Sequence, residues 1–387
     1  MEERKARLGE GGRMESGRMT GKITYEIMHM DRKAACIDTG GRCHIYEKQF
    51  MPYNLYLEEG ERDIDILVNN ITNFYYWCAT RVLTLDRQYA KEILNSIGVS
   101  QAVTDRERAQ VALSYHCLSL TDVYWVRKAG EEITFREINL YQNHLDNAFV
   151  NISLRGKQMT AANQELAKDL STNGCFPKAW LRQEKGFVLL KDGGGDAVDR
   201  EILASRICRC FRCSQVLYKE GEFEGQKVSV SEIMTTQQYG ILSREAFEIY
   251  AVNEGIDPMA YILQLDGYSY YMMNILDYLV GNTDRHWGNW GFLVDNRTNR
   301  LVRLHPLMDF NRSFHSYGEL EGANCQTVLP EIMTQREAAV QAVRQIGLNR
   351  IGDADGNMDI KESWFHGMEQ EYAMFRRRLD LLESIGR

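Results

Sequence analysis

The chain has 387 residues, 44% hydrophobic and 26% charged, as in a globular protein with two or three domains or lobes. Its formal net charge of −8 argues against strong nonspecific nucleic-acid binding, and no apolar run reaches the ~18 residues of a membrane-spanning helix. Nine cysteines without a secretory signal pattern are typical of reduced thiols, so we expect a cytoplasmic protein without membrane insertion.

The first residues differ from the rest of the chain. Residues 1–22 contain Arg and Gly but no apolar segment. We expect them to form a disordered tail, or an extension upstream of a later start such as Met19 or Met28.

An N-terminal module follows the tail. Residues 23–60 alternate apolar and polar positions, which predicts a small β element. Residues 64–117 have the apolar spacing of helices, and Thr104 begins the last helix with a capping pattern. We therefore expect a β/helical module over residues 23–117.

The middle of the chain, residues 118–240, is rich in strand patterns. The spacing of apolar residues and turns predicts strand pairs at 122–141, 176–191 and 214–234, and a helix at 196–211. From 176 to 234 the order strand, strand, helix, strand, strand suits the small β-rich lobe of a nucleotide-dependent kinase.

The remaining residues, 241–387, are mainly helical in pattern. Helices are expected at 243–255, 267–282 and Glu362–Ile385, and short strands at Gly291–Asp295 and Arg300–Leu304. The sequence thus predicts an α+β fold with two lobes, protein-kinase-like, in which a β-rich N-lobe and a helical C-lobe follow an extra N-terminal module.

Chemistry-bearing residues gather in the stretch "NTDRHWGNWGF" and shortly after it. Asp284 and Asn289 are five positions apart, the spacing of the catalytic Asp and the metal-binding Asn in protein kinases. Asp309 follows the two short strands, where a kinase has its second metal-binding Asp. Hard oxygen ligands of this kind suit Mg²⁺.

The string "GNTDRHWGNWGFL…LHPLMDF" resembles the HipA-like bacterial serine/threonine kinases, whose catalytic loop reads Asp-x-His-x-x-Asn before a Pro-(x)-(x)-Asp metal segment. The loop is also similar to that of phosphoinositide kinases. The resemblance implies that Asp284 is the catalytic base and that Asn289 and Asp309 bind metal. It places His286 beside Asp284 in the catalytic loop, as a group that structures the loop.

The resemblance extends to a phosphate loop upstream. "STNGCFPKAW" matches the family's Ser-x-x-Gly-x-x-x-Lys with Ser171, Gly174 and Lys178. Backbone N–H groups of such a loop can cradle phosphates. The family is silenced by phosphorylation of the loop serine, so the resemblance implies the same switch at Ser171.

Three further positions complete the implied nucleotide site. Lys191 ends a predicted strand, and Glu201 follows ten residues later in the first turns of the next helix, where the partner of the phosphate-binding lysine belongs. The backbone near Glu232 and Met234 is the expected hinge that meets the adenine.

These residues favour an ATP- and Mg²⁺-dependent kinase that phosphorylates a Ser/Thr hydroxyl of a protein. The family implies an antitoxin-like regulatory partner. Two alternatives stay open, namely a lipid or small-molecule kinase of the same fold, and a pseudokinase or interaction module that binds nucleotide without chemistry.

Overall fold

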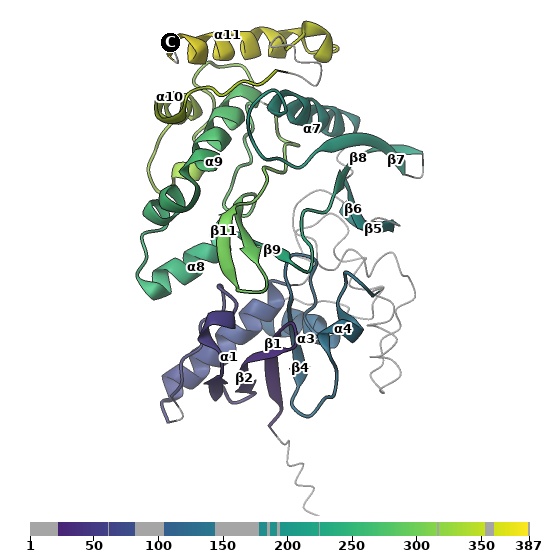
Figure 1. Cartoon of the computed structure of the whole chain (residues 1–387), viewed down its shortest axis with the longest axis vertical. Coiled ribbons are helices and arrows are strands. Elements are labelled where there is room, and N and C mark those ends of the chain that lie inside the picture. The colour runs from purple at the N-terminus through teal and green to yellow at the C-terminus, as the bar shows by residue number, and fades with distance from the viewer. Residues whose placement is uncertain are drawn as a thin grey trace, which may run out of the picture.

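The computed structural model of the chain describes residues 22–60, 62–81, 104–143, 178–183, 186–191, 194–223, 225–315, 317–352 and 360–385. The predicted tail, apart from Lys22, lies outside these residues. The fold mixes α and β structure, and its strands form three antiparallel sheets, of four, four and three strands. Figure 1 shows the N-terminal sheet at one end of the molecule and helices α10 and α11 at the other.

The N-terminal region, residues 22–143, is built around a sheet of order β3-β2-β1-β4. Its elements are β1 Thr24–His29, β2 Arg32–Asp38, β3 Cys43–Ile45, the short 3-10 helix Lys48–Phe50, α1 Ile64–Ala79, α3 Asp105–Ser114, β4 Tyr124–Lys128 and α4 Phe135–Ile138. Helices α1 and α3 pack together, and Phe74, Trp77 and Trp125 are almost fully buried in one hydrophobic core. Asp63 caps α1 by accepting hydrogen bonds from the backbone N–H groups of Asp65 and Ile66.

Two findings in this region differ from the sequence reading. Strand β4, within residues 118–240, pairs with β1 of the N-terminal sheet. The second strand predicted within 122–141 is wrong, because α4 lies there. Thr134 and Glu137 form a capping box, in which the side chain of each residue accepts a hydrogen bond from the backbone N–H of the other. This local capping outweighs the β-type composition of the segment.

The second sheet has the order β5-β6-β8-β7 and carries one helix. The elements are β5 Lys178–Gln183, β6 Gly186–Lys191, α7 Gly195–Cys208, β7 Tyr218–Phe223 and β8 Gln226–Glu232. Both strand pairs and the helix confirm the predictions for 176–191, 214–234 and 196–211. Helix α7 contacts β7 and β8, so a helix residue can face the end of β6 across the sheet.

The third sheet, of order β11-β10-β9, stands beside the long helix α9. Its strands and the remaining helices are β9 Tyr239–Ser243, α8 Arg244–Glu254, α9 Pro258–Val280, β10 Gly291–Asp295, β11 Arg300–Leu304, the 3-10 helix Gln326–Val328, α10 Gln335–Ile346, the 3-10 helix Glu362–Trp364 and α11 Glu369–Ile385. The predicted strands β10 and β11 are confirmed at their predicted bounds. The helix expected from Glu362 begins at Glu369, after a 3-10 turn.

Helix α9 is the centre of the second hydrophobic core. Its residues Met272, Ile275 and Leu279 have no exposed surface, and α10 packs along it. Asp266 departs from helical geometry, so the predicted helix at 267–282 matches the part of α9 after this kink. The helix ends at Gly281 with φ +60°, where a Cβ atom would lie 2.2 Å from the Tyr317 ring. Only glycine fits this helix end.

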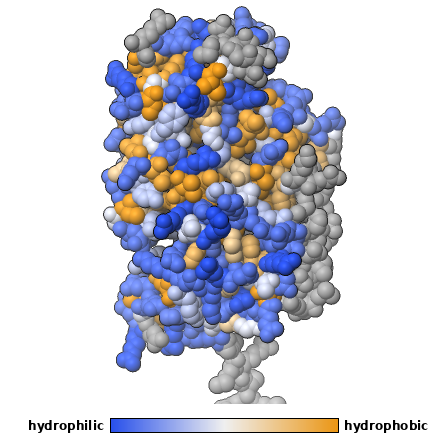
Figure 2. Space-filling model, viewed as in Figure 1, coloured by the Kyte–Doolittle hydropathy of each residue, from blue (hydrophilic) through white to orange (hydrophobic). Residues whose placement is uncertain are grey.

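The face in Figure 2 is mainly hydrophilic over the N-terminal region, while hydrophobic patches alternate with hydrophilic residues over the upper part of the molecule. Exposed large hydrophobic side chains nevertheless occur in both parts, including Ile64 on α1 and Val252 on α8. Within the described ranges, no helix combines the length and the apolar character required to cross a bilayer.

Candidate active site

The candidate catalytic loop joins the end of α9 to β10. Asp277 on α9 accepts a hydrogen bond from Asn282 Nδ2 at 3.0 Å, and Asn282 Oδ1 accepts one from the Asp284 N–H at 3.2 Å. Asn289 Nδ2 donates to the Asp284 carbonyl oxygen at 2.9 Å. These hydrogen bonds therefore close the loop on itself around Asp284, which is half-buried.

Arg285 fixes this loop from the buried side. Its guanidinium pairs with the Asp277 carboxylate through Nε at 2.8 Å and Nη2 at 3.0 Å, with both side chains buried. Nη1 donates to the carbonyl oxygens of Asn289 at 2.9 Å and Met308 at 2.5 Å. One buried cation thus joins the loop to the segment that carries Asp309. Burial would lower the pKa of Arg285, but Asp277 outweighs burial and raises the pKa.

The N-terminus of α8 holds the other side of the loop. The N–H of Arg244 donates to the Trp290 carbonyl at 2.8 Å, and the N–H of Glu245 donates to the Trp287 carbonyl at 3.1 Å. Ser243 Oγ caps a third N–H, that of Ala246, at 3.1 Å. The first N–H groups of a helix have no partner within the helix, so the loop carbonyls both satisfy them and are fixed by them.

His286 is exposed and makes a local contact. Its Nδ1 accepts a hydrogen bond from the Gly288 N–H at 3.0 Å. This is the contact of a residue that shapes a turn, in keeping with the loop-structuring role that the sequence implied. The structure places His286 beside Asp284 in the chain, with its ring at the surface.

Lys191, Glu201 and Asp309 come together from three elements. Lys191 Nζ at the end of β6 lies 2.9 Å from Glu201 Oε1 on α7 and 3.0 Å from Asp309 Oδ1. The Lys191 and Glu201 side chains are 8% and 1% exposed, which removes solvent screening from their attraction. Burial alone would lower the pKa of Lys191, but the carboxylates of Asp309 and Glu201 raise it well above its ordinary value.

Tyr218 and Ser229 support this cluster. The Tyr218 hydroxyl accepts the Asp309 N–H at 2.9 Å, and its ring lies 5.0 Å from Lys191 Nζ. Ser229 Oγ donates to the second oxygen of Glu201. Asp309 itself has φ +60°, a backbone conformation that residues other than glycine adopt only occasionally. The surrounding contacts therefore specify the position of Asp309 tightly.

The other predicted positions are placed less completely. Lys178 pairs with Lys191 in the β5–β6 register. Glu232 ends β8 opposite Val188, and Met234 follows in the connection to β9, packed against the second hydrophobic core. Ser171 and Gly174 lie outside the described residues.

Sequence reasoning missed the residues that support the loop and the lysine, above all Asp277, Asn282 and Tyr218. Asp277 stands five residues before the recognised motif and Asn282 is its first residue, but no local pattern distinguishes them from ordinary helix and loop residues. Tyr218 is 91 residues from Asp309, so its contact depends on how the second sheet meets the loop.

Comparison with known proteins reveals similarity of fold. No protein-family model matches the sequence, and no curated protein matches it. Among solved structures, a chain of the Shewanella oneidensis MR-1 toxin–antitoxin complex of HipA, HipB and operator DNA is similar with a TM-score of 0.55 and 12% identity, over 94% of this chain and 99% of that one. The Helicobacter pylori proinflammatory kinase CtkA is similar with a TM-score of 0.43 and 13% identity, over 56% of this chain and 91% of that one. The chain therefore has a HipA-like fold.

Proposed function

We propose that this protein is an ATP- and Mg²⁺-dependent kinase of the HipA-like type, which transfers the γ-phosphate of ATP to a Ser/Thr hydroxyl of a protein. The observation that carries the proposal is the joint placement of Lys191 against Glu201 and Asp309. This placement supports the proposal, because protein kinases use a lysine–glutamate pair and a metal-binding aspartate for phosphoryl transfer. In this proposal the second sheet with α7 serves as the small lobe, and α8 to α11 form the helical lobe.

The residues fit a magnesium–nucleotide complex. Asn289 uses its amide nitrogen to hold the Asp284 carbonyl, which turns its side-chain oxygen to the other side as a donor of the type that Mg²⁺ prefers. Asp309 supplies a carboxylate beside the lysine. Bound Mg²⁺ would neutralise phosphate charge during transfer.

The chain's own side chains would divide the remaining work. Lys191, oriented by Glu201, would hold the α and β phosphates, and the backbone at Glu232 and Met234 would meet the adenine. Asp284 would accept the proton of the attacking hydroxyl, while Arg285 keeps the loop in position. Ser171, Gly174 and Lys178 are proposed as the phosphate loop, with autophosphorylation at Ser171 as a switch.

The test compares phosphate transfer by the parent protein and by Asp284→Ala, with labelled ATP and Mg²⁺. We expect the variant to lose about 10²- to 10⁴-fold in rate, the usual contribution of a positioned general base. Asp65→Ala, an exposed aspartate on α1, is the matched control and should retain full activity. Equal transfer by Asp284→Ala and the parent would refute the assignment.

The acceptor and the partner need separate experiments. A panel of protein, lipid and small-molecule acceptors separates a protein kinase from the other kinases of this fold. A thermal-shift titration with ATP, with and without Mg²⁺, tests the pseudokinase or interaction module. Stabilisation that requires Mg²⁺ favours a kinase, and the absence of any shift favours the non-catalytic alternative. The HipA structure contains HipB and operator DNA, which supports the proposal of an antitoxin-like partner for this chain.

A further inference from the structure

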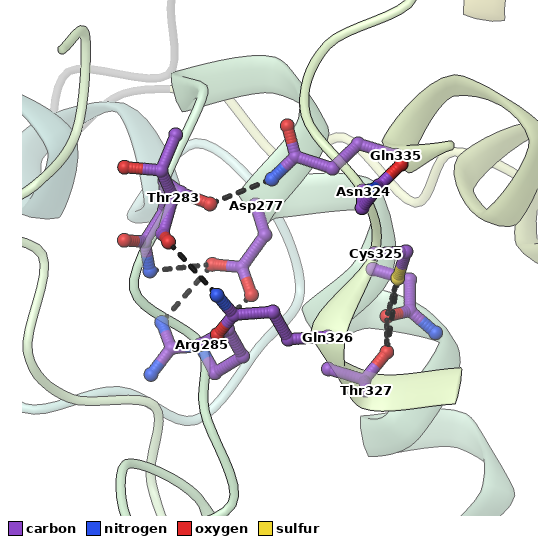
Figure 3. A pocket seen from close by; sticks show the side chains of 10 residues that line it. Asp277, Thr283, Arg285, Asn324, Cys325, Gln326, Thr327 and Gln335 are labelled. Atoms are coloured by element: carbon purple, nitrogen blue, oxygen red, sulfur yellow. Dashed lines mark hydrogen bonds and ion pairs between the residues drawn. The ribbon is translucent and has the colours of Figure 1, made fainter. Parts of the chain in front are cut away.

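After Asp309 the chain returns to the catalytic loop through residues 322–335. This return segment and the loop enclose a small polar pocket, whose wall includes Thr283, Gln326 and Gln335 (Figure 3). The close-up shows the two glutamine side chains reaching from the return segment toward the loop. The two residues that precede Asp284 in the chain, Asn282 and Thr283, line this pocket together with Asp277 and Arg285.

Gln335 uses both ends of its carboxamide. Its Nε2 donates to the Asn282 carbonyl at 2.6 Å, and its Oε1 accepts the Ala323 N–H at 3.1 Å. The residue is 5% exposed. Reversing the amide would set a donor against a donor and an acceptor against an acceptor, so the two contacts fix a single orientation.

These contacts reach Asp284 in one further step. Gln335 holds the Asn282 carbonyl, and the side-chain oxygen of the same Asn282 accepts the Asp284 N–H. The next carbonyl, that of Thr283, accepts a hydrogen bond from Gln326 Nε2 at 3.2 Å. Both peptide units that precede Asp284 are therefore held by glutamines of the return segment.

The return segment is anchored at its end by helix α10. Gln335 is the first residue of α10, which begins with a capping box between Thr334 and Glu337 and packs along α9. At Gly322, φ is +72° and an added Cβ would lie 2.7 Å from Gln335 Oε1. The glycine thus permits the close approach that the Ala323–Gln335 contact needs.

We propose that Gln335 is a positioning residue for phosphoryl transfer, which holds the peptide units before Asp284 so that its carboxylate faces the attacking hydroxyl. This inference rests on the proposed role of Asp284 as the base. Since a displacement of about 1 Å in a reacting group can cost on the order of 10²-fold in rate, a hydrogen bond two residues away can control turnover.

The test is Gln335→Glu, which is nearly isosteric, keeps an acceptor for the Ala323 N–H and removes the donor to the Asn282 carbonyl. The matched control is Gln341→Glu, the same change at an exposed position of α10. We expect kcat to fall at least about 10-fold in Gln335→Glu, with the KM for ATP within about twofold of the control. A kcat equal to that of the control, or a KM that rises as much as kcat falls, would overturn the proposal.

A second measurement does not depend on activity. Backbone hydrogen exchange of residues 282–290 should be faster in Gln335→Glu than in Gln341→Glu, and equal rates would show that Gln335 does not hold the loop. If the parent transfers no phosphate, the proposed function fails, while hydrogen exchange still shows whether Gln335 holds the loop. If Gln335→Glu does not fold, Gly322→Ala replaces it, since its added methyl group acts on the Gln335 contact from the other side. The same fall in kcat at constant KM is expected, and its absence contradicts the proposal.

Discussion

Arg81 and Arg285 each make a two-pronged contact with an aspartate, in two different regions of the molecule. Arg81 meets Asp122 in the N-terminal region at 2.7 and 2.8 Å, and Arg285 meets Asp277 beside the catalytic loop at 2.8 and 3.0 Å. Both guanidinium groups are almost fully buried. Their remaining hydrogen bonds differ.

The additional acceptors of Arg81 are the carbonyls of Cys117 and Tyr124, which tie the end of α1 to the residues around β4 within one hydrophobic core. Those of Arg285 are the carbonyls of Asn289 and Met308, which belong to the two segments that carry the candidate reactive groups. A buried arginine–aspartate pair can therefore join structural elements or align a site. The carbonyls that it serves distinguish the two uses.

The largest effect is expected from Arg285→Ala. It leaves the Asp277 carboxylate buried without its cation, which should lower the free energy of unfolding by about 3–5 kcal/mol and also abolish phosphate transfer. Urea unfolding and the transfer assay measure the two losses. The double variant Arg285→Ala/Asp277→Ala should recover part of the stability but none of the transfer, because the loop remains unfixed. Recovery of transfer would contradict the aligning role.

Arg81→Ala should cost somewhat less, about 3 kcal/mol of unfolding free energy, because Asp122 is 20% exposed and can reach water. The transfer rate per folded molecule should stay within about twofold of the parent, since the lost contacts lie in the N-terminal region. Activity is measured at a temperature where circular dichroism shows the variant to be folded. A large fall in kcat there would break the distinction between the two arginines.

Two buried histidines extend the comparison to pH. Burial lowers the pKa of His29 in the N-terminal region, and that of His305 after β11, to about 4. Between about pH 6.5 and 4 these histidines bind protons in the unfolded chain but stay neutral in the folded chain. The free energy of unfolding should therefore fall as the pH falls through this range. Each histidine can contribute at most about 3 kcal/mol.

His29→Phe tests the N-terminal contribution. The His29 ring packs against Phe50 and Tyr124, and its two nitrogens find no hydrogen-bond partner among the described residues, so a phenyl ring suits the site. Urea unfolding at pH 7, 5.5 and 4.5 should give a shallower loss of stability than in the parent. His366→Phe, at an exposed position, should leave the slope unchanged. An unaltered slope in His29→Phe would refute the assignment.

The smallest effect is expected from an exposed pair. Arg376 and Asp380 are one turn apart on α11, 3.0 Å from each other and 35% and 61% exposed. Arg376→Ala should change the free energy of unfolding by at most about 0.5 kcal/mol, and less at high salt. Urea unfolding at two salt concentrations measures this change. A loss as large as that of Arg81→Ala would mean that burial does not separate the pairs.

The sequence allowed those elements to be predicted whose signals are local. Strands β10 and β11 contain the short apolar runs Phe292–Val294 and Leu301–Val302, and α7 begins after a run of glycines, so their patterns were sufficient. Helix α10 was missed although its capping box between Thr334 and Glu337 is visible in the sequence. Helix α4 was misread because four residues are too few to show a helical period.

For the candidate site, order along the chain indicated which residues to expect together, and the structure brings Glu201 and Asp309 within hydrogen-bond distance of Lys191. Their chemical roles stay predictions until they are measured. The supporting contacts could not be foreseen, because Gln335 meets Asn282 across 53 residues of chain and only the packing of α10 on α9 brings them together.

In the proposed kinase, the contact between Lys191 and Asp309 has a consequence for nucleotide binding. The Lys191 ammonium already has two carboxylate partners, Glu201 and Asp309, so a metal–phosphate complex meets a cation that is already paired. Its binding is an exchange of counterions, in which the phosphates take over the ammonium and the metal takes over the carboxylate. Phosphates that draw the ammonium away from Asp309 would raise the affinity of that carboxylate for a metal ion, while Lys191 keeps Glu201 as a counterion. The two ligands should consequently bind with positive cooperativity, each raising the affinity for the other.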